Sequence, residues 1–140
     1  MAQGLPEVAL LSIRPEYAEA ILDGSKRVEF RRTRFSRDVS FVVIYATQPV
    51  GKVVGWFEVE AIEADSPARL WSEFSDCGGI SKSQFLAYYD GSDTGYAIRV
   101  RHAHRLPRAR QLKSAAGLDR APQSFAYLEA SKARKLLNHR

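Results

Sequence analysis

Cysteine is nearly absent from this chain of 140 residues, and long apolar runs are missing as well. The single Cys77 excludes an intramolecular disulfide, which makes a reducing compartment the default. The longest apolar run, residues 41–46, is far shorter than the ~20 residues that a membrane helix needs. The N-terminus does not combine a basic start with an apolar segment, so no secretory signal is expected. These absences predict a cytoplasmic protein without contact to a membrane.

Motifs that bind phosphates and metals are missing too. No Gly-rich stretch has the spacing of a phosphate loop or of a dinucleotide site, so chemistry on nucleoside triphosphates is not expected. His102 and His104 would share one strand face, but a metal site needs three or four ligands and only Cys77 could add another. A catalytic pair of Cys77 with one of these histidines lacks a local signature. We therefore expect no metal and no cofactor.

The length of 140 residues predicts a single domain, 1–140, that buries roughly two thirds of the surface of its unfolded chain. Its net charge of +5 is distributed unevenly. Residues 24–37 and 105–140 are basic, whereas residues 58–93 are acidic. Such a polarised surface favours an anionic partner on its basic side, although the same charges also serve solubility.

The order of the expected elements predicts the fold class. Apolar periodicity, helix starts and turn residues indicate strands over 8–13, 28–32, 41–46, 53–62 and 96–104, and helices over 15–23, 68–75, 81–89 and, with a basic face, about 123–138. Helices inserted between strands, without strict alternation, predict an α+β domain. We expect a small mixed β-barrel with flanking helices.

Residues 24–32 crowd charged side chains around only two large apolar ones. If residues 28–32 form a strand, its period of two puts Glu29 and Arg31 together on one face. Lys26 lies just before this strand and can reach the same side. One interpretation is a solvated strand face with a weak ion pair, worth about 0–1 kcal/mol, and the other is a polar cleft.

Aromatic residues interleave with basic ones, which suits base stacking at ~1–3 kcal/mol per base. Most of these rings should belong to the core. Trp56 is the exception, because the alternation within residues 53–62 puts it on the face of Glu58 and Glu60. A large aromatic residue on a polar face often marks a binding surface. Gly55 beside it indicates a bulge or a close backbone approach.

Several of these segments resemble one known family. Residues 11–15 open a helix, residues 21–31 contain the pattern Gly-x-Lys-x-x-Glu-x-Arg, and residues 44–49 read Ile-Tyr-Ala-Thr-x-Pro. Together they are similar to the ASCH domain of the PUA-like superfamily. Residues 122–128 are similar to the ending of a branch of that family labelled predicted transcriptional regulators.

The resemblance implies a barrel of five or six strands, with the first helix beside it and a charged cleft between the two. It also implies that the partner is RNA, or another nucleic acid or nucleotide. Lys26, Glu29 and Arg31 are the positions that match the family's site. The full set of candidate ligand-binding residues is Lys26, Glu29, Arg31, Tyr45, Thr47, Trp56, Gln123 and Ser124.

The leading hypothesis is therefore an RNA-binding or nucleotide-binding module with a regulatory role. In this hypothesis the Glu29 carboxylate accepts a hydrogen bond from a base amino group, while the cations hold phosphate or carbonyl oxygen. A third, simpler possibility is a protein partner that binds the basic terminal helix.

The alternative is an enzyme. Some relatives in the family resemble amidohydrolases that remove the acetyl group from N4-acetylcytidine with a lysine nucleophile. Lys26 matches that lysine, but Glu29 stands where those proteins have threonine. A hydrolase acting on a modified nucleoside or on RNA would use Lys26 as nucleophile or general base and Glu29 as proton carrier. The sequence leaves the ligand, turnover and the oligomeric state open.

Overall fold

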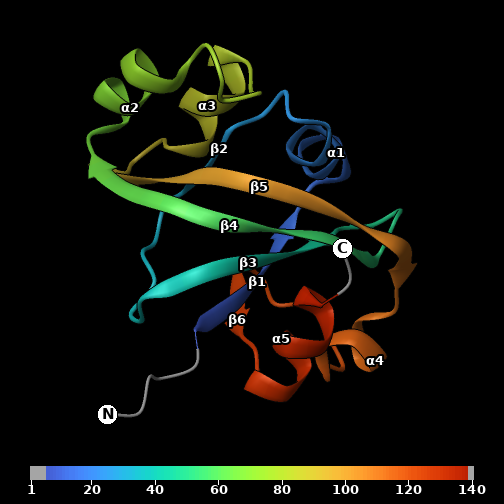
Figure 1. The fold of residues 1–140 in the computed structure, drawn as a ribbon. Coiled ribbons are helices and arrows are strands. Elements are labelled where there is room, and N and C mark those ends of the chain that lie inside the picture. The colour runs from blue at the N-terminus through green and yellow to red at the C-terminus, as the bar shows by residue number, and fades with distance from the viewer. Residues whose placement is uncertain (1–5, 139–140) are drawn as a thin grey trace.

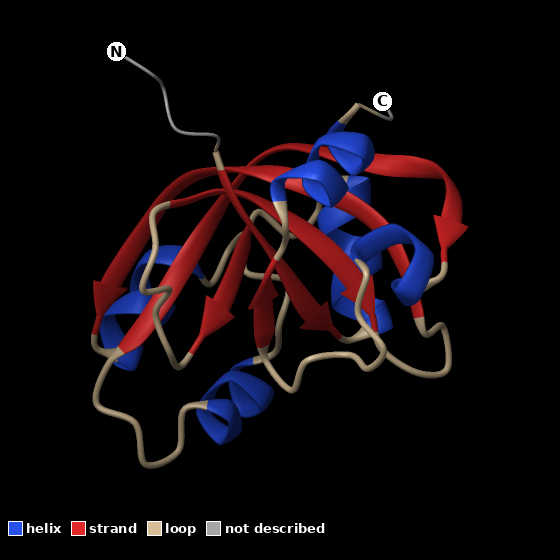
Figure 2. Ribbon diagram, turned by 90° about the horizontal axis from the view of Figure 1, so that it is seen from below, coloured by secondary structure: helices blue, strands red, loops and turns tan. Residues whose placement is uncertain are grey.

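The structure, a computed structural model, describes residues 6–138. Its strands are β1 (Glu7–Ile13), β2 (Val28–Arg31), β3 (Val39–Ala46), β4 (Lys52–Asp65), β5 (Gly95–Arg110) and β6 (Phe125–Tyr127). They form one mixed sheet in the order β2-β5-β4-β3-β1-β6, in which β1 and β3 are parallel and the other pairs are antiparallel. The sheet curls into a half-barrel (Figures 1 and 2). The expected α+β class, a mixed barrel with flanking helices, is confirmed.

Helices cover both faces of this sheet. They are α1 (Pro15–Asp23), α2 (Pro67–Phe74), α3 (Lys82–Tyr88), α4 (Leu112–Ala116) and α5 (Ala130–Leu137). In Figure 1, α1, α2 and α3 lie on one side of the sheet and α4 and α5 on the other. One core cluster, which includes Tyr45 and Leu136, fills the side of α4 and α5. Another, which includes Ile21 and Ile44, lies on the side of α1.

Helix α1 begins and ends where the sequence predicts. Pro15 stands in the first turn, where its missing N–H is not needed. Gly24 has a φ of 91°, in the left-handed region, and its N–H donates to the Ile21 carbonyl oxygen at 3.2 Å. This sharp ending leads directly into β2, which begins at Val28. Lys26 therefore lies in a short connection between a helix and an edge strand.

Strand β3, which contains the strand predicted over 41–46, is buried on both faces. Val43 and Tyr45 point into the core on the side of α4 and α5, whereas Val42 and Ile44 point into the core on the side of α1. Each of these four side chains is buried. The strand pairs with β1 on one edge and β4 on the other, which explains its uninterrupted apolar sequence.

A bulge and a close backbone approach at Gly55 lie directly before Trp56. The register of β4 against β5 shifts between Val53 and Gly55, and a Cβ added to Gly55 would lie 2.5 Å from the His104 carbonyl oxygen and 2.6 Å from Leu22 Cδ2. The predicted bulge and close approach are confirmed. Trp56 pairs with Val43 and Glu58 with Phe41 on β3, so Trp56 shares a face with Glu58 as predicted, but residues of α4 and α5 cover this part of the face and Trp56 is only 3% exposed. The polar surface that was expected at Trp56 is instead part of the core.

The second half of the chain differs from the expected elements. Strand β5 continues beyond its predicted end at residue 104 to Arg110. Pro107 does not end the strand, because it lies in the stretch 106–109, for which no pairing with β4 is found. Residues 125–127, expected to be helical, form β6 instead, and the terminal helix begins only at Ala130. The free edge of β1 recruits β6 through backbone pairing, which outweighs the local helical pattern. Helix α4 was not predicted.

The contact at Gly55 yields a stability prediction. We expect Gly55→Ala to lower the free energy of unfolding by about 1–3 kcal/mol, because the added methyl group meets backbone of β5 and a side chain of α1. Urea unfolding monitored by tryptophan fluorescence measures the change. Ala64→Val, at an exposed position of the same strand, serves as the control and should change stability by no more than about 0.5 kcal/mol. Equal losses in both variants would contradict the interpretation.

Candidate functional site

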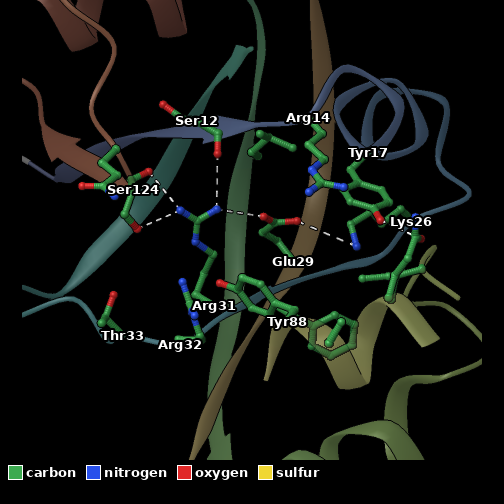
Figure 3. Close-up of a pocket in the computed structure, with 16 residues that line it drawn as sticks. Ser12, Arg14, Tyr17, Lys26, Glu29, Arg31, Arg32, Thr33, Tyr88 and Ser124 are labelled. Atoms are coloured by element: carbon green, nitrogen blue, oxygen red, sulfur yellow. Dashed lines mark hydrogen bonds and ion pairs between the residues drawn. The ribbon is translucent and has the colours of Figure 1, made fainter. Parts of the chain in front are cut away.

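A pocket of about 600 Å³ lies at the seam of the half-barrel, where its two edge strands are not paired with each other. Its lining residues lie in four segments of the chain, within 12–17, 26–33, 80–88 and 123–124. Helices α1 and α3 flank the pocket, β2 crosses its floor, and the residues before β6 form the opposite wall (Figure 3). The seam thus brings together side chains that are far apart in sequence.

Lys26 forms the deepest polar part of this pocket and is 2% exposed. Its backbone N–H donates to the Ala20 carbonyl oxygen at 3.0 Å, which fixes the connection after α1. Its Nζ donates a hydrogen bond to the Gly78 carbonyl oxygen. The same nitrogen lies 5.1 Å from the ring centroid of Tyr17 and 5.3 Å from that of Phe30, distances at which a cation is attracted by the ring.

Glu29 connects Lys26 to Arg31. Its Oε1 lies 3.8 Å from the Lys26 Nζ, and its Oε2 lies 3.1 Å from the Arg31 Nη1. Arg31 continues across the seam, where Nη2 donates to the carbonyl oxygen and the hydroxyl oxygen of Ser124 at 2.9 and 2.8 Å. Its Nη1 also donates to the Ser12 carbonyl oxygen at 3.4 Å. One guanidinium therefore joins β2, β1 and the segment before β6.

Burial decides between the two sequence interpretations of this strand. Glu29 is 6% exposed, so the face that it shares with Arg31 is not a solvated one. The apolar residues on the other face, Val28 and Phe30, pack with α2 and α3. Strand β2 thus separates an apolar core from a polar pocket, as its alternation predicts.

The surroundings shift two pKa values in the pocket. Burial lowers the pKa of Lys26, and the neighbouring Glu29 carboxylate opposes this shift. Burial likewise raises the pKa of Tyr17, with a smaller contribution from Glu16. Tyr17 therefore remains a neutral phenol, and its hydroxyl donates to the Gln84 Oε1 at 2.9 Å. This bond links α1 to α3 across the pocket.

The eight candidate residues divide into two groups. Lys26, Glu29, Arg31, Gln123 and Ser124 all line the pocket. Tyr45 and Trp56 lie in the core under α4 and α5, with 6% and 3% of their surfaces exposed. Thr47 follows β3, where its backbone N–H donates to the Ile13 carbonyl oxygen at 2.9 Å. The last three do not line the pocket.

Eleven further lining residues were not among the sequence candidates, and they include Arg14, Tyr17, Arg32, Gln84 and Tyr88. Arg14 belongs to the segment 11–15 that is similar to the family, and Tyr17 lies in the helix predicted over 15–23, but neither was assigned to the site. Gln84 and Tyr88 come from α3, more than fifty residues beyond Lys26. Only the tertiary fold brings α3 to the pocket, so no local signal could have found them.

Two expectations concern other kinds of site. Within residues 6–138, no group of three or more His, Cys, Asp or Glu side chains has a geometry that could hold a metal ion. His102 has a positive φ of 51° and is exposed, whereas the ring of His104 lies 4.3 Å from that of Trp56. The described chain also contains no helix that is long and apolar enough to cross a membrane.

The half-barrel with its flanking helices fits the PUA-like superfamily. More specifically, the chain belongs to the ASCH domain family, whose family model matches residues 11–132. A crystal structure of ASCH from Zymomonas mobilis superposes with a TM-score of 0.85 at 33% sequence identity, and the match covers 93% of each chain. The fold and the family are thereby established.

Two curated relatives differ in how much of their length is matched. An ASCH domain-containing ribonuclease of Zymomonas mobilis is 34% identical over 133 residues, which cover 93% of this chain and 90% of that protein. Large ribosomal subunit protein uL22 of Ureaplasma parvum is 32% identical over 124 residues, but the chain spans only 40% of its length. Neither is named as a transcriptional regulator, so that part of the expectation gains no support from them.

The burial of Lys26 predicts a specific pH dependence of stability. The unfolded chain has Lys26 at its ordinary pKa of 10.5, and the folded chain has it at a lower pKa. Between these two values the unfolded state binds more protons, so the free energy of unfolding rises with pH, by up to about 1.4 kcal/mol per pH unit. Lys26→Met should remove this rise.

Urea unfolding of the wild-type protein and of Lys26→Met from pH 7 to pH 10.5 measures the effect. The difference between their free energies of unfolding cancels the titration of other groups. Lys135→Met changes an exposed lysine of α5 and should leave the rise intact. Parallel pH curves for the wild-type protein and Lys26→Met would show that burial does not lower the pKa of Lys26.

Proposed function

We propose that this protein binds RNA and holds one of its nucleotides in the pocket around Lys26, Glu29 and Arg31. One observation carries the proposal: a concave site of about 600 Å³ combines a buried carboxylate with several cations and tyrosine rings. Sites for small molecules in proteins occupy roughly 300–1,000 Å³. The ribonuclease name of the Zymomonas mobilis relative supports RNA as the class of ligand.

The charge of the pocket suits a phosphate group. Its lining contains Arg14, Lys26, Arg31 and Arg32, against Glu29 as its one carboxylate. Arg14 and Arg32 are exposed at the rim, whereas Lys26 is buried at the floor. A phosphate at the rim would form charge-assisted hydrogen bonds to Arg14 or Arg32 and leave the floor for a base.

The floor suits the edge of a base. A carboxylate offers only acceptors, so Glu29 selects a donor such as an exocyclic amino group. Its Oε1 is 3.8 Å from Lys26, too far for a full hydrogen bond, and this oxygen retains the capacity to accept one. Tyr17 and Tyr88 lie on the flanks of the pocket (Figure 3) and expose part of their rings for stacking.

RNA binding is tested with a labelled single-stranded RNA at two salt concentrations. Binding should weaken as salt rises, because phosphate contacts release counterions. Glu29→Gln and Lys26→Gln should each weaken binding about tenfold or more, the effect of losing one hydrogen bond to a charged group. Lys135→Gln, on the far side of the sheet, should change it less than twofold. No binding by the wild-type protein at low salt would refute the proposal.

The second candidate function is cleavage of RNA, which the name of the Zymomonas mobilis relative favours. The pKa of Lys26 is lowered by burial, so at a given pH more of its amine is neutral and able to accept a proton than in an exposed lysine. In such a reaction the 2′-oxygen loses its proton to Lys26, attacks the adjacent phosphorus and displaces the 5′-oxygen, which takes a proton from solvent. Arg31 and Arg32 would stabilise the charge that develops on phosphate.

Incubation of a 5′-labelled RNA with the protein tests cleavage. We expect fragments that end in a 2′,3′-cyclic phosphate, at a rate that falls at least 100-fold in Lys26→Gln. An RNA with 2′-deoxyribose at every position should bind but remain intact. Wild-type activity in Lys26→Gln would exclude this mechanism, and tight binding of RNA that stays intact would favour a regulatory role.

A further inference from the structure

The segment between β2 and β3 extends from the rim of the pocket to the opposite edge of the sheet. Residues 32–37, here called the seam segment, are held against β6 by several contacts, among them contacts of Phe35 and Ser36. The ring of Phe35 packs on that of Phe125 with centroids 4.8 Å apart. The backbone N–H of Ser36 donates to the Tyr127 hydroxyl at 2.9 Å. The seam segment therefore has a fixed position across the open side of the half-barrel.

The seam segment carries three exposed arginines, two of which lie on tyrosine rings. The guanidinium carbon of Arg32 is 4.9 Å from the ring centroid of Tyr88, and that of Arg37 is 4.3 Å from that of Tyr127. Arg34 lies between them and has no ion-pair partner within residues 6–138. Cations next to aromatic rings are the combination that surfaces for single-stranded nucleic acids use.

Two carboxylates lie near the far end of this segment. Glu7 Oε1 is 3.4 Å from Arg37 Nη1, and both side chains are about half exposed. An exposed ion pair of this kind contributes little to stability, so a phosphate can replace Glu7 as the partner of Arg37. Asp38 follows the seam segment directly and is exposed. The arginines outnumber these carboxylates, and the segment keeps a net positive charge.

We infer that the seam segment continues the nucleotide pocket into a track for single-stranded RNA. The track begins at Arg32 and Tyr88 on the pocket rim, passes Arg34, and ends at Arg37 and Tyr127 beside β6. Phosphates would contact the arginines, while bases stack on the exposed parts of the two tyrosines. This inference rests on the proposed function, because the pocket supplies the first nucleotide position.

The length of the track sets the size of the RNA that it holds. The five peptide steps from Arg32 to Arg37 span at most about 18 Å, at about 3.5 Å per residue. A stacked single strand rises by about 3.4 Å per nucleotide, so at most about five nucleotides cover this distance. With one nucleotide in the pocket, the complete site holds at most about a hexamer. Longer RNA should bind with little additional affinity.

The experiment compares a nucleoside monophosphate with a single-stranded RNA hexamer, each titrated into the 140-residue protein. The double variant Arg34→Ala/Arg37→Ala should weaken hexamer binding about tenfold and leave monophosphate binding within twofold. It should also lower the slope of log affinity against log salt by about 1.4, the value for two lost phosphate contacts on a single strand. Glu7→Gln removes the competing carboxylate and should strengthen hexamer binding two- to threefold.

The matched control is Arg108→Ala/Arg134→Ala, which removes two exposed arginines from β5 and α5. It should change neither affinity by more than twofold. Equal losses of hexamer affinity in the two double variants would overturn the track. The same holds if Arg34→Ala/Arg37→Ala binds the hexamer as tightly as the wild-type protein does.

The same measurements separate the track from the pocket. If Lys26→Gln weakens binding of both ligands while Arg34→Ala/Arg37→Ala weakens neither, the pocket is retained and the track is refuted. If the monophosphate does not bind and Lys26→Gln leaves hexamer affinity unchanged, the pocket proposal fails. A loss in Arg34→Ala/Arg37→Ala alone would then support the track as the RNA surface.

Discussion

The carboxylate of Glu29 is the group on which both the site and the closure of the half-barrel depend. It lies between the Lys26 ammonium at 3.8 Å and the Arg31 guanidinium at 3.1 Å, in a region where all three side chains are largely buried. Removing one partner from a buried ionic group leaves a charge without compensation, at a cost of about 3–5 kcal/mol. The same carboxylate holds Arg31 in the position from which it reaches Ser124. One ionised group thus organises the pocket floor and the seam together.

The pocket exists because a side chain, and not a backbone ladder, joins the edges of the sheet. Hydrogen-bonded strands lie about 4.8 Å apart, which leaves no room for a ligand between them. At the seam Arg31 spans the gap from β2 to the Ser12 and Ser124 carbonyl oxygens. The Ser12 hydroxyl also donates to the Pro122 carbonyl oxygen at 2.6 Å, which fixes the wall of the pocket. A half-barrel closed in this way is held together and still open to a small molecule.

The sequence predicted what depends on local chemistry and failed where distant partners decide. Pro15 and Gly24 define α1 by backbone rules that need no tertiary contact, and the alternation of β2 correctly separated the two faces of that strand. The sequence could not show that Lys26 is buried, because the surroundings of Lys26 come from α1 and from the loop that contains Gly78. Trp56 keeps the alternation that the prediction used, but the sequence could not show that residues of the distant α4 and α5 cover its part of the strand face.

Opposing influences on Lys26 connect its protonation to the charge of whatever occupies the pocket. Desolvation favours the neutral amine, whereas Glu29 favours the ammonium, and desolvation is the larger effect. An anionic group beside Lys26 would add to the influence of Glu29 and raise the pKa of Lys26 again. A neutral ligand that only excludes water would lower the pKa further. By linkage, an anionic ligand is then bound together with a proton at pH values near the lowered pKa, and a neutral ligand releases one.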